Sequence, residues 1–162
     1  MKTWNKRPRE IRTLFNPAFC GLVIARGIEG FYETAKRPIP YSLTLLILPL
    51  CLHKQTRNIF KSGKSSYFTK IMQEHPEIRI EFAKRARSLF PYTMEAFAYL
   101  TSYGAATIDI SGGISIKKNT VRKLIKGTQD AKDCQIIARV VGRKFGQLNN
   151  RVTIYTTLGI RP

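Results

Sequence analysis

The apolar residues near the start of the chain recur every three or four positions. They are Phe19, Val23, Ile24, Ile28 and Phe31. This spacing predicts an amphipathic helix, and Asn16-Pro17 supplies its start, a capping side chain followed by a proline at the first helical position. We expect the helix to run to about Tyr32. Three glycines inside it lower its stability by up to about 1 kcal/mol each, so close packing against a neighbour is the expected compensation. These glycines are Gly21, Gly27 and Gly30.

The most hydrophobic stretch, Leu43 to Leu52, is apolar on every side. Such a segment is predicted to be buried, either in the protein itself or against a partner. Ser42 is expected to cap it as a helix, and Pro49 to bend that helix. Because it has about half the length of a bilayer span, we interpret it as a core segment. Residues 54–64, which are basic and contain Gly and Ser, are predicted to be a connection.

The next forty residues are predicted to form three helices. The first covers about 65–75, the second 76–90, ending at Pro91, and the third 93–103, with Thr93 as its cap and Gly104 as its stop. The second has a buried stripe at intervals of four, four and three residues.

From residue 107 the pattern changes to the alternation that is typical of strands. A hairpin with a three-residue loop, 111–113, would pair Ile110 with Ile114 and Ile108 with Ile116. All four isoleucines would then lie on one face, with Gly113 in the left-handed conformation that such a loop requires.

The last part of the chain is predicted to be a basic link, a long helix and a strand. Thr128 caps the helix, which runs to about Phe145 with Lys132, Arg139 and Arg143 opposite its buried stripe. That stripe consists of Cys134, Ile137, Val141, Phe145 and Leu148. Residues 152–158 are rich in Thr, Val, Ile and Tyr and are predicted to be a strand.

Taken together, these elements predict an α+β fold that is mainly helical. We expect one domain, 1–162, with possible sub-parts 1–64, 65–127 and 128–162. Three helices before a hairpin is the order of a winged helix-turn-helix, although many small α+β domains share it. The candidate recognition helix, 93–103, has no Arg, Lys, Asn or Gln to read base edges, which disfavours sequence-specific DNA binding. Its aromatic residues fit a protein interface, although core packing is their ordinary use.

Charge brings in a candidate partner. The chain has 28 Lys and Arg against 10 Asp and Glu, a formal charge of +18, which indicates an anionic partner, with nucleic acid as the leading class. A merely solvated surface is the alternative. Positive charge is densest after residue 111, where cations outnumber acids and suit phosphate contact without base reading; an acidic partner protein, or no role at all, would also explain it. The candidate nucleic-acid-binding residues are Lys117, Lys118, Arg122, Lys123, Lys126, Arg139, Arg143 and Arg151.

Signals of catalysis, metal binding and export are weak. Cys20, Cys51 and Cys134 are far apart among apolar neighbours and are predicted to be buried thiols in a reducing compartment. His53 and His75 lack partners at metal-ligand spacing except the acids flanking His75, and no nucleophile or phosphate-loop motif is present. The amino terminus lacks the apolar core of a signal peptide. We therefore expect a cytoplasmic protein that is not an enzyme, binds no cofactor or metal and does not enter a membrane.

Several strings along the whole chain resemble the middle component of three-component ABC ATPase systems. They are Trp4-Asn5-Lys6-Arg7-Pro8, Asn16-Pro17-Ala18-Phe19-Cys20-Gly21, Pro40-Tyr41-Ser42-Leu43 through Leu48-Pro49-Leu50 to His53-Lys54, Arg85-Ala86-Arg87 before Pro91-Tyr92-Thr93, and Thr153-Ile154-Tyr155 with Leu158-Gly159-Ile160-Arg161-Pro162. Residues 105–127 match least, so the resemblance does not imply DNA contact there.

The resemblance implies an accessory subunit between an ATPase of the structural-maintenance-of-chromosomes (SMC) type and an effector, often a nuclease, in defence systems such as the Lamassu type. We therefore expect an adaptor that assists with sequence-independent DNA contact. A stand-alone DNA- or RNA-binding protein is the alternative, and a small basic nuclease or toxin would need a catalytic group that is not visible. Candidate partner-binding residues are Leu45, Leu46, Leu48, Leu50, Phe97 and Tyr99.

Overall fold

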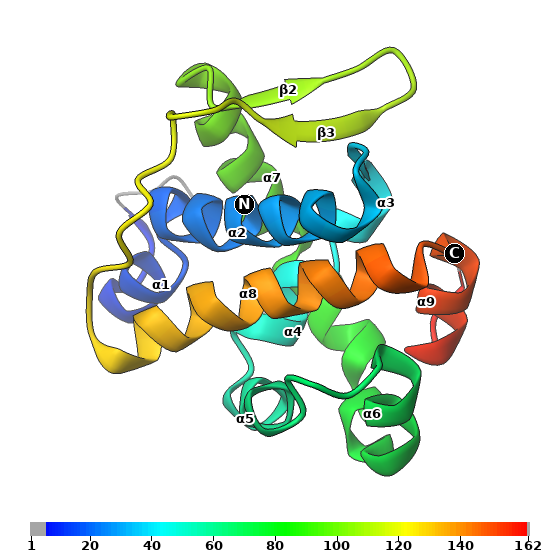
Figure 1. Cartoon of the computed structure of the whole chain (residues 1–162). Helices are drawn as coiled ribbons and strands as arrows, with labels where there is room; N and C mark the ends of the chain where they lie inside the picture. Colours follow the sequence, from blue (N-terminus) through cyan, green and yellow to red (C-terminus); the bar gives the residue numbers. More distant parts are fainter. Residues whose placement is uncertain (1–5, 162) are drawn as a thin grey trace.

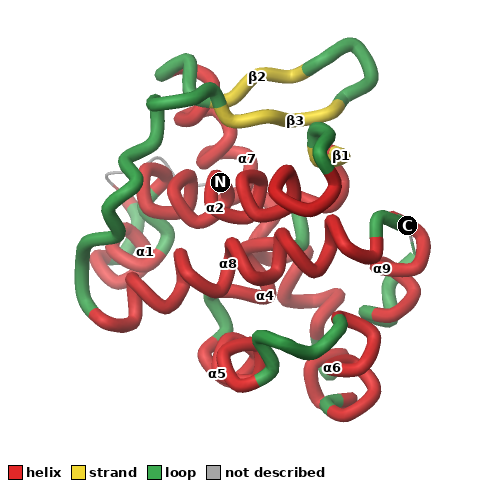
Figure 2. Tube along the Cα trace, viewed as in Figure 1, coloured by secondary structure: helices red, strands yellow, loops and turns green. Residues whose placement is uncertain are grey.

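The computed structural model describes residues 6–161, which form helices around a buried core with a small sheet at one side (Figures 1 and 2). Trp4, Asn5 and Pro162, from the opening and closing strings of the resemblance, lie outside the described residues. The helices are α1 (Arg9–Leu14), α2 (Pro17–Ala35), α3 (Tyr41–Thr44), α4 (Ile47–Cys51), α5 (Lys54–Ser62), α6 (Phe68–Glu74), the 3-10 helix η2 (Pro76–Arg79), α7 (Phe82–Ser102), α8 (Gln129–Leu148) and α9 (Arg151–Thr157). The strands are β1 (Ile39–Pro40), β2 (Ala106–Ile108) and β3 (Gly113–Ile116).

Helices α2 and α8 lie side by side at the centre, running in the same direction (Figure 1). Both begin as predicted. The Asn16 side chain accepts from the amides of Ala18 and Phe19, and Thr128 accepts from the amide of Ala131. The many helices and the one small sheet confirm the predicted α+β class, which is mainly helical.

Glycines let the two central helices touch through their backbones. A Cβ on Gly30 would collide with the carbonyl of Arg139, and a Cβ on Gly142 with the carbonyl of Gly27. The predicted close packing is therefore confirmed for α2. Gly21 differs, because its nearest neighbour is the flexible side chain of Leu100 at 3.3 Å.

The apolar run after α2 is buried in the chain's own core, but it is not one capped helix. It forms α3 and α4, separated by a turn at Leu45–Leu46. Pro49 has no N–H to bond the carbonyl of Leu45, which accounts for the break. Ser42 does not cap, and its buried Oγ has no hydrogen-bond partner among the described residues.

Residues 54–64 were predicted to be a connection, but most of them form the helix α5. Its N-cap is His53, whose Nδ1 accepts from the amide of Thr56 at 3.4 Å. Arg57 is buried and donates to the carbonyl oxygens of Cys51 (2.9 Å) and Leu52 (3.2 Å). Phe60 on the same helix is buried, and its burial stabilises a helix that the basic composition did not predict.

The predicted break at Pro91 is wrong, because α7 passes through this residue without interruption. Leu89, Ala96 and Leu100, on both sides of the proline, are buried in the same core. Their burial outweighs the ~3 kcal/mol that an internal proline costs. Thr93 is therefore no cap; its hydroxyl donates to the carbonyl of Leu89 at 3.1 Å inside the helix. With residues 82–102 as one helix, the predicted helix-turn-helix before the hairpin is not formed, and the winged-helix prediction is not confirmed.

The hairpin exists, with its loop one residue earlier than predicted. Ile108 lies opposite Ile114, and Ala106 opposite Ile116. The loop is 110–112, and Gly112 rather than Gly113 has the positive φ, +77°. Asp109 decides this, because its Oδ1 accepts from the amides of Ser111 (2.8 Å) and Gly113 (2.9 Å). β1 adds a third strand on the other side of β3, giving the order β1-β3-β2.

The end of the chain is the helix α9 rather than the predicted strand. Asn150 caps it by accepting from the amide of Thr153. Ile154, Tyr155 and Leu158 are buried at helical spacing, and Tyr155 donates to the carbonyl of Ser42 at 2.8 Å. Local β propensity is overridden by this packing.

One hydrophobic core joins residues from all three predicted sub-parts of the chain. The predicted stripe of α8 lies in it, with Leu148 at its margin. Cys20, Cys51 and Cys134 are buried free thiols, as predicted. Within residues 6–161, no helix has the length and apolar character needed to cross a bilayer.

Candidate nucleic-acid interface

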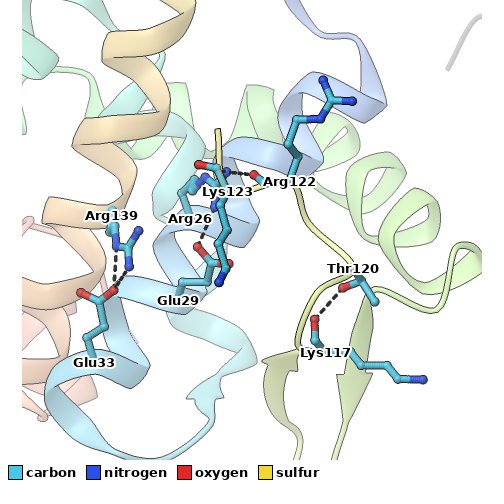
Figure 3. A network of polar contacts seen from close by, with 8 residues as sticks. All are labelled: Arg26, Glu29, Glu33, Lys117, Thr120, Arg122, Lys123 and Arg139. Carbon is cyan, nitrogen blue, oxygen red and sulfur yellow. Dashed lines mark hydrogen bonds and ion pairs between the residues drawn. The ribbon is translucent and has the colours of Figure 1, made fainter. Parts of the chain in front are cut away.

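The basic link between β3 and α8, residues 117–128, has no regular secondary structure. It starts at a backbone hydrogen bond from Lys117 to the carbonyl of Ala105 (2.9 Å) and turns at Asn119, which has a φ of +65°. The hydroxyl of Thr120 donates to the carbonyl of Lys117 at 2.6 Å (Figure 3). Lys118, Arg122 and Lys126 recur every four residues and would share one edge of a helix, but the link is not helical.

Arg26 of α2 fixes the middle of the link. The residue is 2% exposed, and its guanidinium donates to the carbonyl oxygens of Arg122 and Lys123 and to Glu29, the last at 2.9 Å (Figure 3). A buried charge is tolerated here because backbone oxygens and a carboxylate accept from its two terminal nitrogens, although its Nε has no partner among the described residues. The link is therefore held by its carbonyls, which leaves its basic side chains to solvent.

Five cations project from the link without an anionic partner. Lys117, Lys118, Arg122, Lys123 and Lys126 are all exposed. None of them has an ion pair with any of residues 6–161. The side chains of Arg122 and Lys123 leave the link in opposite directions (Figure 3). Unpaired cations on an extended segment suit contact with phosphates.

The other three candidate residues do not join this cluster. Arg139 and Arg143, on α8, both donate to the carboxylate of Glu33 on α2, with Arg139 Nε at 2.6 Å. Burial would raise the pKa of Glu33, but hydrogen bonds from the two arginines outweigh it and hold that pKa below its usual value. Arg151 begins α9, which lies at the far end of α8 from the link (Figure 1). Helix α8 is about 30 Å long, so Arg151 is well separated from the link.

A groove lies between the link, β3 and α2, with a volume of about 740 Å³. Its apolar lining includes Ile28, Ile114, Ile116 and Val121. Lys117, Lys118 and Lys123 border it, whereas Arg122 and Lys126 do not. The cluster is thus divided into cations at the groove and cations away from it.

The proposed partner-binding residues are placed mostly inside the molecule. Leu46, Leu48 and Leu50 are buried, so these leucines offer no surface to a partner, and Leu45 is partly exposed. The prediction of partner binding is therefore wrong for Leu46, Leu48 and Leu50. Phe97 is buried beside Tyr41, at 5.7 Å between ring centroids, while Tyr99 is exposed and lies 4.6 Å from the ring of Tyr103.

Sequence reasoning missed the buried cations that position these surfaces. Besides Arg26, Lys144 is buried in α8, donating to the carbonyls of Lys64 (2.9 Å) and Ser66. Burial lowers the pKa of Lys144. The only sequence signal was the Arg26 and Glu29 pair at helical spacing, since carbonyl acceptors cannot be read from side-chain types. No group of three or more His, Cys, Asp and Glu in residues 6–161 could hold a metal ion.

Comparison with known proteins places these features in a family. A family model described as ABC-three component (ABC-3C) system Middle Component 3 matches residues 4–162. No curated protein matches the chain, and no solved structure does.

Proposed function

Because the chain belongs to the family of middle component 3 of ABC-three component systems, we propose that it is a non-enzymatic adaptor. It joins an ABC ATPase subunit of the SMC type to an effector, such as a nuclease, in a cytoplasmic system that defends the cell against phages and plasmids. The family match over nearly the whole chain is the observation that carries this proposal.

The adaptor also contacts DNA without reading its sequence. Support comes from the five exposed, unpaired cations of the link and from the net charge of +18. Phosphate contacts of this kind position a protein on DNA but carry no base preference directly. Arg122 and Lys126, which do not line the groove, are assigned to this contact.

Charge reversal in the assembled complex tests the DNA contact. Arg122→Glu with Lys126→Glu should weaken binding to unrelated duplexes about equally, and should reduce the magnitude of the log–log salt slope by ~0.9 for each lost contact. Arg87→Glu with Lys64→Glu makes the same change in charge at exposed positions outside the link and should leave more of the affinity. Equal loss in both double variants would contradict a contact localised at the link.

Size-exclusion chromatography comes before the titrations. If the link instead docks on an acidic surface of the ATPase, the Arg122 and Lys126 variant will dissociate from the complex before DNA is added. Co-expression with the genes of its own operon tests the adaptor itself, since an adaptor requires a stable stoichiometric complex. The charge also supports a second candidate, a stand-alone DNA- or RNA-binding protein, which would bind nucleic acid fully without co-purifying partners.

A further inference from the structure

The edge of β3 that faces α2 is only partly covered. β1 pairs with β3 at two positions, Ile39 with Ile114 and Pro40 with Gly113. The residue before β1 is Pro38, which has no N–H and cannot donate to an extension of this ladder. Beyond Ile114, β3 therefore has no hydrogen-bonded strand on that side among the described residues.

The backbone of Ile116 is directed to the open edge. Hydrogen bonds join Lys117 to Ala105 and Asp109 to Gly113, so the odd-numbered residues of β3 bond to β2. In an antiparallel ladder the intervening residues direct their N–H and C=O to the other side. Ile116 thus offers a donor and an acceptor to an added strand.

The groove beside this edge combines an apolar floor with a basic rim. Ile28, Ile116 and Val121 line it, and the half-exposed Tyr32 projects from α2 at its side. Its two acids are already matched, Glu29 by Arg26 and Glu33 by Arg139 and Arg143. The three bordering lysines of the link are not, so the groove has unbalanced positive charge.

We propose that this groove binds an extended acidic segment of a partner subunit, which adds as a strand to the open edge of β3. The open stretch, 115–118, accommodates about four residues, ~13 Å of strand. Alternating side chains would place apolar groups on the floor and carboxylates near the lysines. Duplex DNA could use the lysines but neither the apolar floor nor the backbone of Ile116. The inference rests on the adaptor part of the proposed function and not on DNA contact.

The first test uses the isolated full chain and a fluorescein-labelled ten-residue peptide of alternating Glu and Val, followed by fluorescence anisotropy. Lys123→Glu should weaken peptide binding about tenfold. Arg122→Glu should change it by less than about twofold, because the side chain of Arg122 leaves the link in the opposite direction from that of Lys123 (Figure 3). A peptide of alternating Glu and Ser should bind clearly more weakly, because it cannot fill the apolar floor. Equal effects of the two substitutions, or equal binding of the two peptides, would overturn the groove.

The strand addition has its own variant. Ile116→Pro removes the N–H at the open edge without touching the bonds to β2 and should weaken peptide binding about fivefold. Ile116→Val keeps the N–H and should bind nearly as the unaltered chain does. If Ile116→Pro does not fold, as judged by circular dichroism, the crosslinking experiment below decides.

The second test uses the complex co-expressed with the ATPase and the third component. Replacing Tyr32 by the photocrosslinker p-benzoylphenylalanine should give, on irradiation, a crosslink to an acidic stretch of a partner subunit, identified by mass spectrometry. Crosslinking to DNA, or to nothing in an intact complex, would overturn the groove and leave the adaptor standing. If no complex forms, the adaptor fails, while the peptide titration still reports on the groove.

Discussion

At the scale of single residues, buried charges organise this protein. Arg26 and Lys144 each donate to backbone carbonyls of a distant segment, the basic link and the connection between α5 and α6 respectively. Arg57 donates to the carbonyls of Cys51 and Leu52, six and five residues earlier at the end of α4. A cation taken out of water is costly unless several acceptors satisfy it. These side chains therefore hold irregular backbone in place where no helix or strand does so.

Glu33, which binds Arg139 and Arg143, predicts a pH-dependent contribution to stability. Because the pKa of Glu33 is lower in the folded protein than its usual value, the contribution is present above about pH 4.3 and is lost as the pH falls through the folded value. Glu33→Gln should lower the free energy of unfolding by about 1 kcal/mol at pH 7, since both arginines are nearly half exposed. Urea unfolding at pH 7 and pH 3 measures the difference, which should be smaller at pH 3.

Glu74→Gln is the matched control. Glu74 and Lys70 are both exposed, with 3.8 Å between their charged atoms, so this change should be close to neutral at either pH. A loss at pH 3 as large as at pH 7 for Glu33→Gln would mean that packing, not charge, explains the effect.

The thiols predict slow modification in the native state. Burial raises the pKa of Cys20 to about 12 and that of Cys51 well above its usual value, and only the thiolate reacts. Ellman's reagent at pH 8 should modify the native chain slowly and the urea-unfolded chain at all three cysteines at once. A Ser65→Cys variant, at an exposed position, should react quickly in the native state; fast reaction of the unaltered chain would contradict the burial of its thiols.

At the scale of elements, the contact between α2 and α8 determines the architecture. Gly30 of α2 lies against the carbonyl of Arg139 on α8, and Gly142 of α8 lies against the carbonyl of Gly27 on α2. Small residues bring the helix axes together, and the surrounding side chains can then pack on both helices. The entropy that glycine costs a helix is thus compensated by tertiary contact.

Alanine scanning of these glycines tests the contact. Gly30→Ala and Gly142→Ala would each place a Cβ against a backbone carbonyl that cannot move aside, so each should destabilise the protein by about 3 kcal/mol or more. Gly21→Ala meets only the end of Leu100 and gains helix propensity, so it should stay within about 1 kcal/mol of the unaltered chain. Thermal unfolding followed by circular dichroism ranks the three; equal effects would contradict the close backbone approach.

At the scale of the whole molecule, positive charge is in excess. A net charge of +18 on 162 residues makes the folded state repel itself, and this repulsion is screened within about a Debye length. Several of the ion pairs among the described residues, such as Lys70 with Glu74 and Lys84 with Glu81, are at the surface and individually contribute little. Self-repulsion should therefore decide how the isolated chain responds to salt.

Salt is expected to stabilise the isolated chain. Raising NaCl from about 20 to 300 mM shortens the Debye length from roughly 20 to 6 Å, so the midpoint of thermal unfolding should rise. Heparin at low salt should raise it further, because a polyanion binds the folded cationic surface. Differential scanning fluorimetry measures both; a fall with salt would show that the ion pairs, rather than net repulsion, dominate.

Local sequence determined the starts of the central helices and the buried positions of α8. Asn16-Pro17 and Thr128 act through hydrogen bonds within three residues, and helical spacing of apolar residues fixes which side of α8 faces inward. The length of the hairpin loop was also predictable. These features depend on interactions between neighbours in the chain, which is why spacing and residue type sufficed.

Tertiary structure decided the rest. Burial on both sides of Pro91 kept α7 continuous, and burial of Tyr155 turned a strand-like sequence into α9. The position of the hairpin loop is the exception, because the local hydrogen bonds of Asp109 placed it one residue earlier. Tertiary structure also decided the link, whose cations were predicted, while its path is set by Arg26, about a hundred residues earlier in the chain. Energies of burial and of long-range hydrogen bonds exceed local propensities of about 1 kcal/mol, and they depend on which segments meet in space.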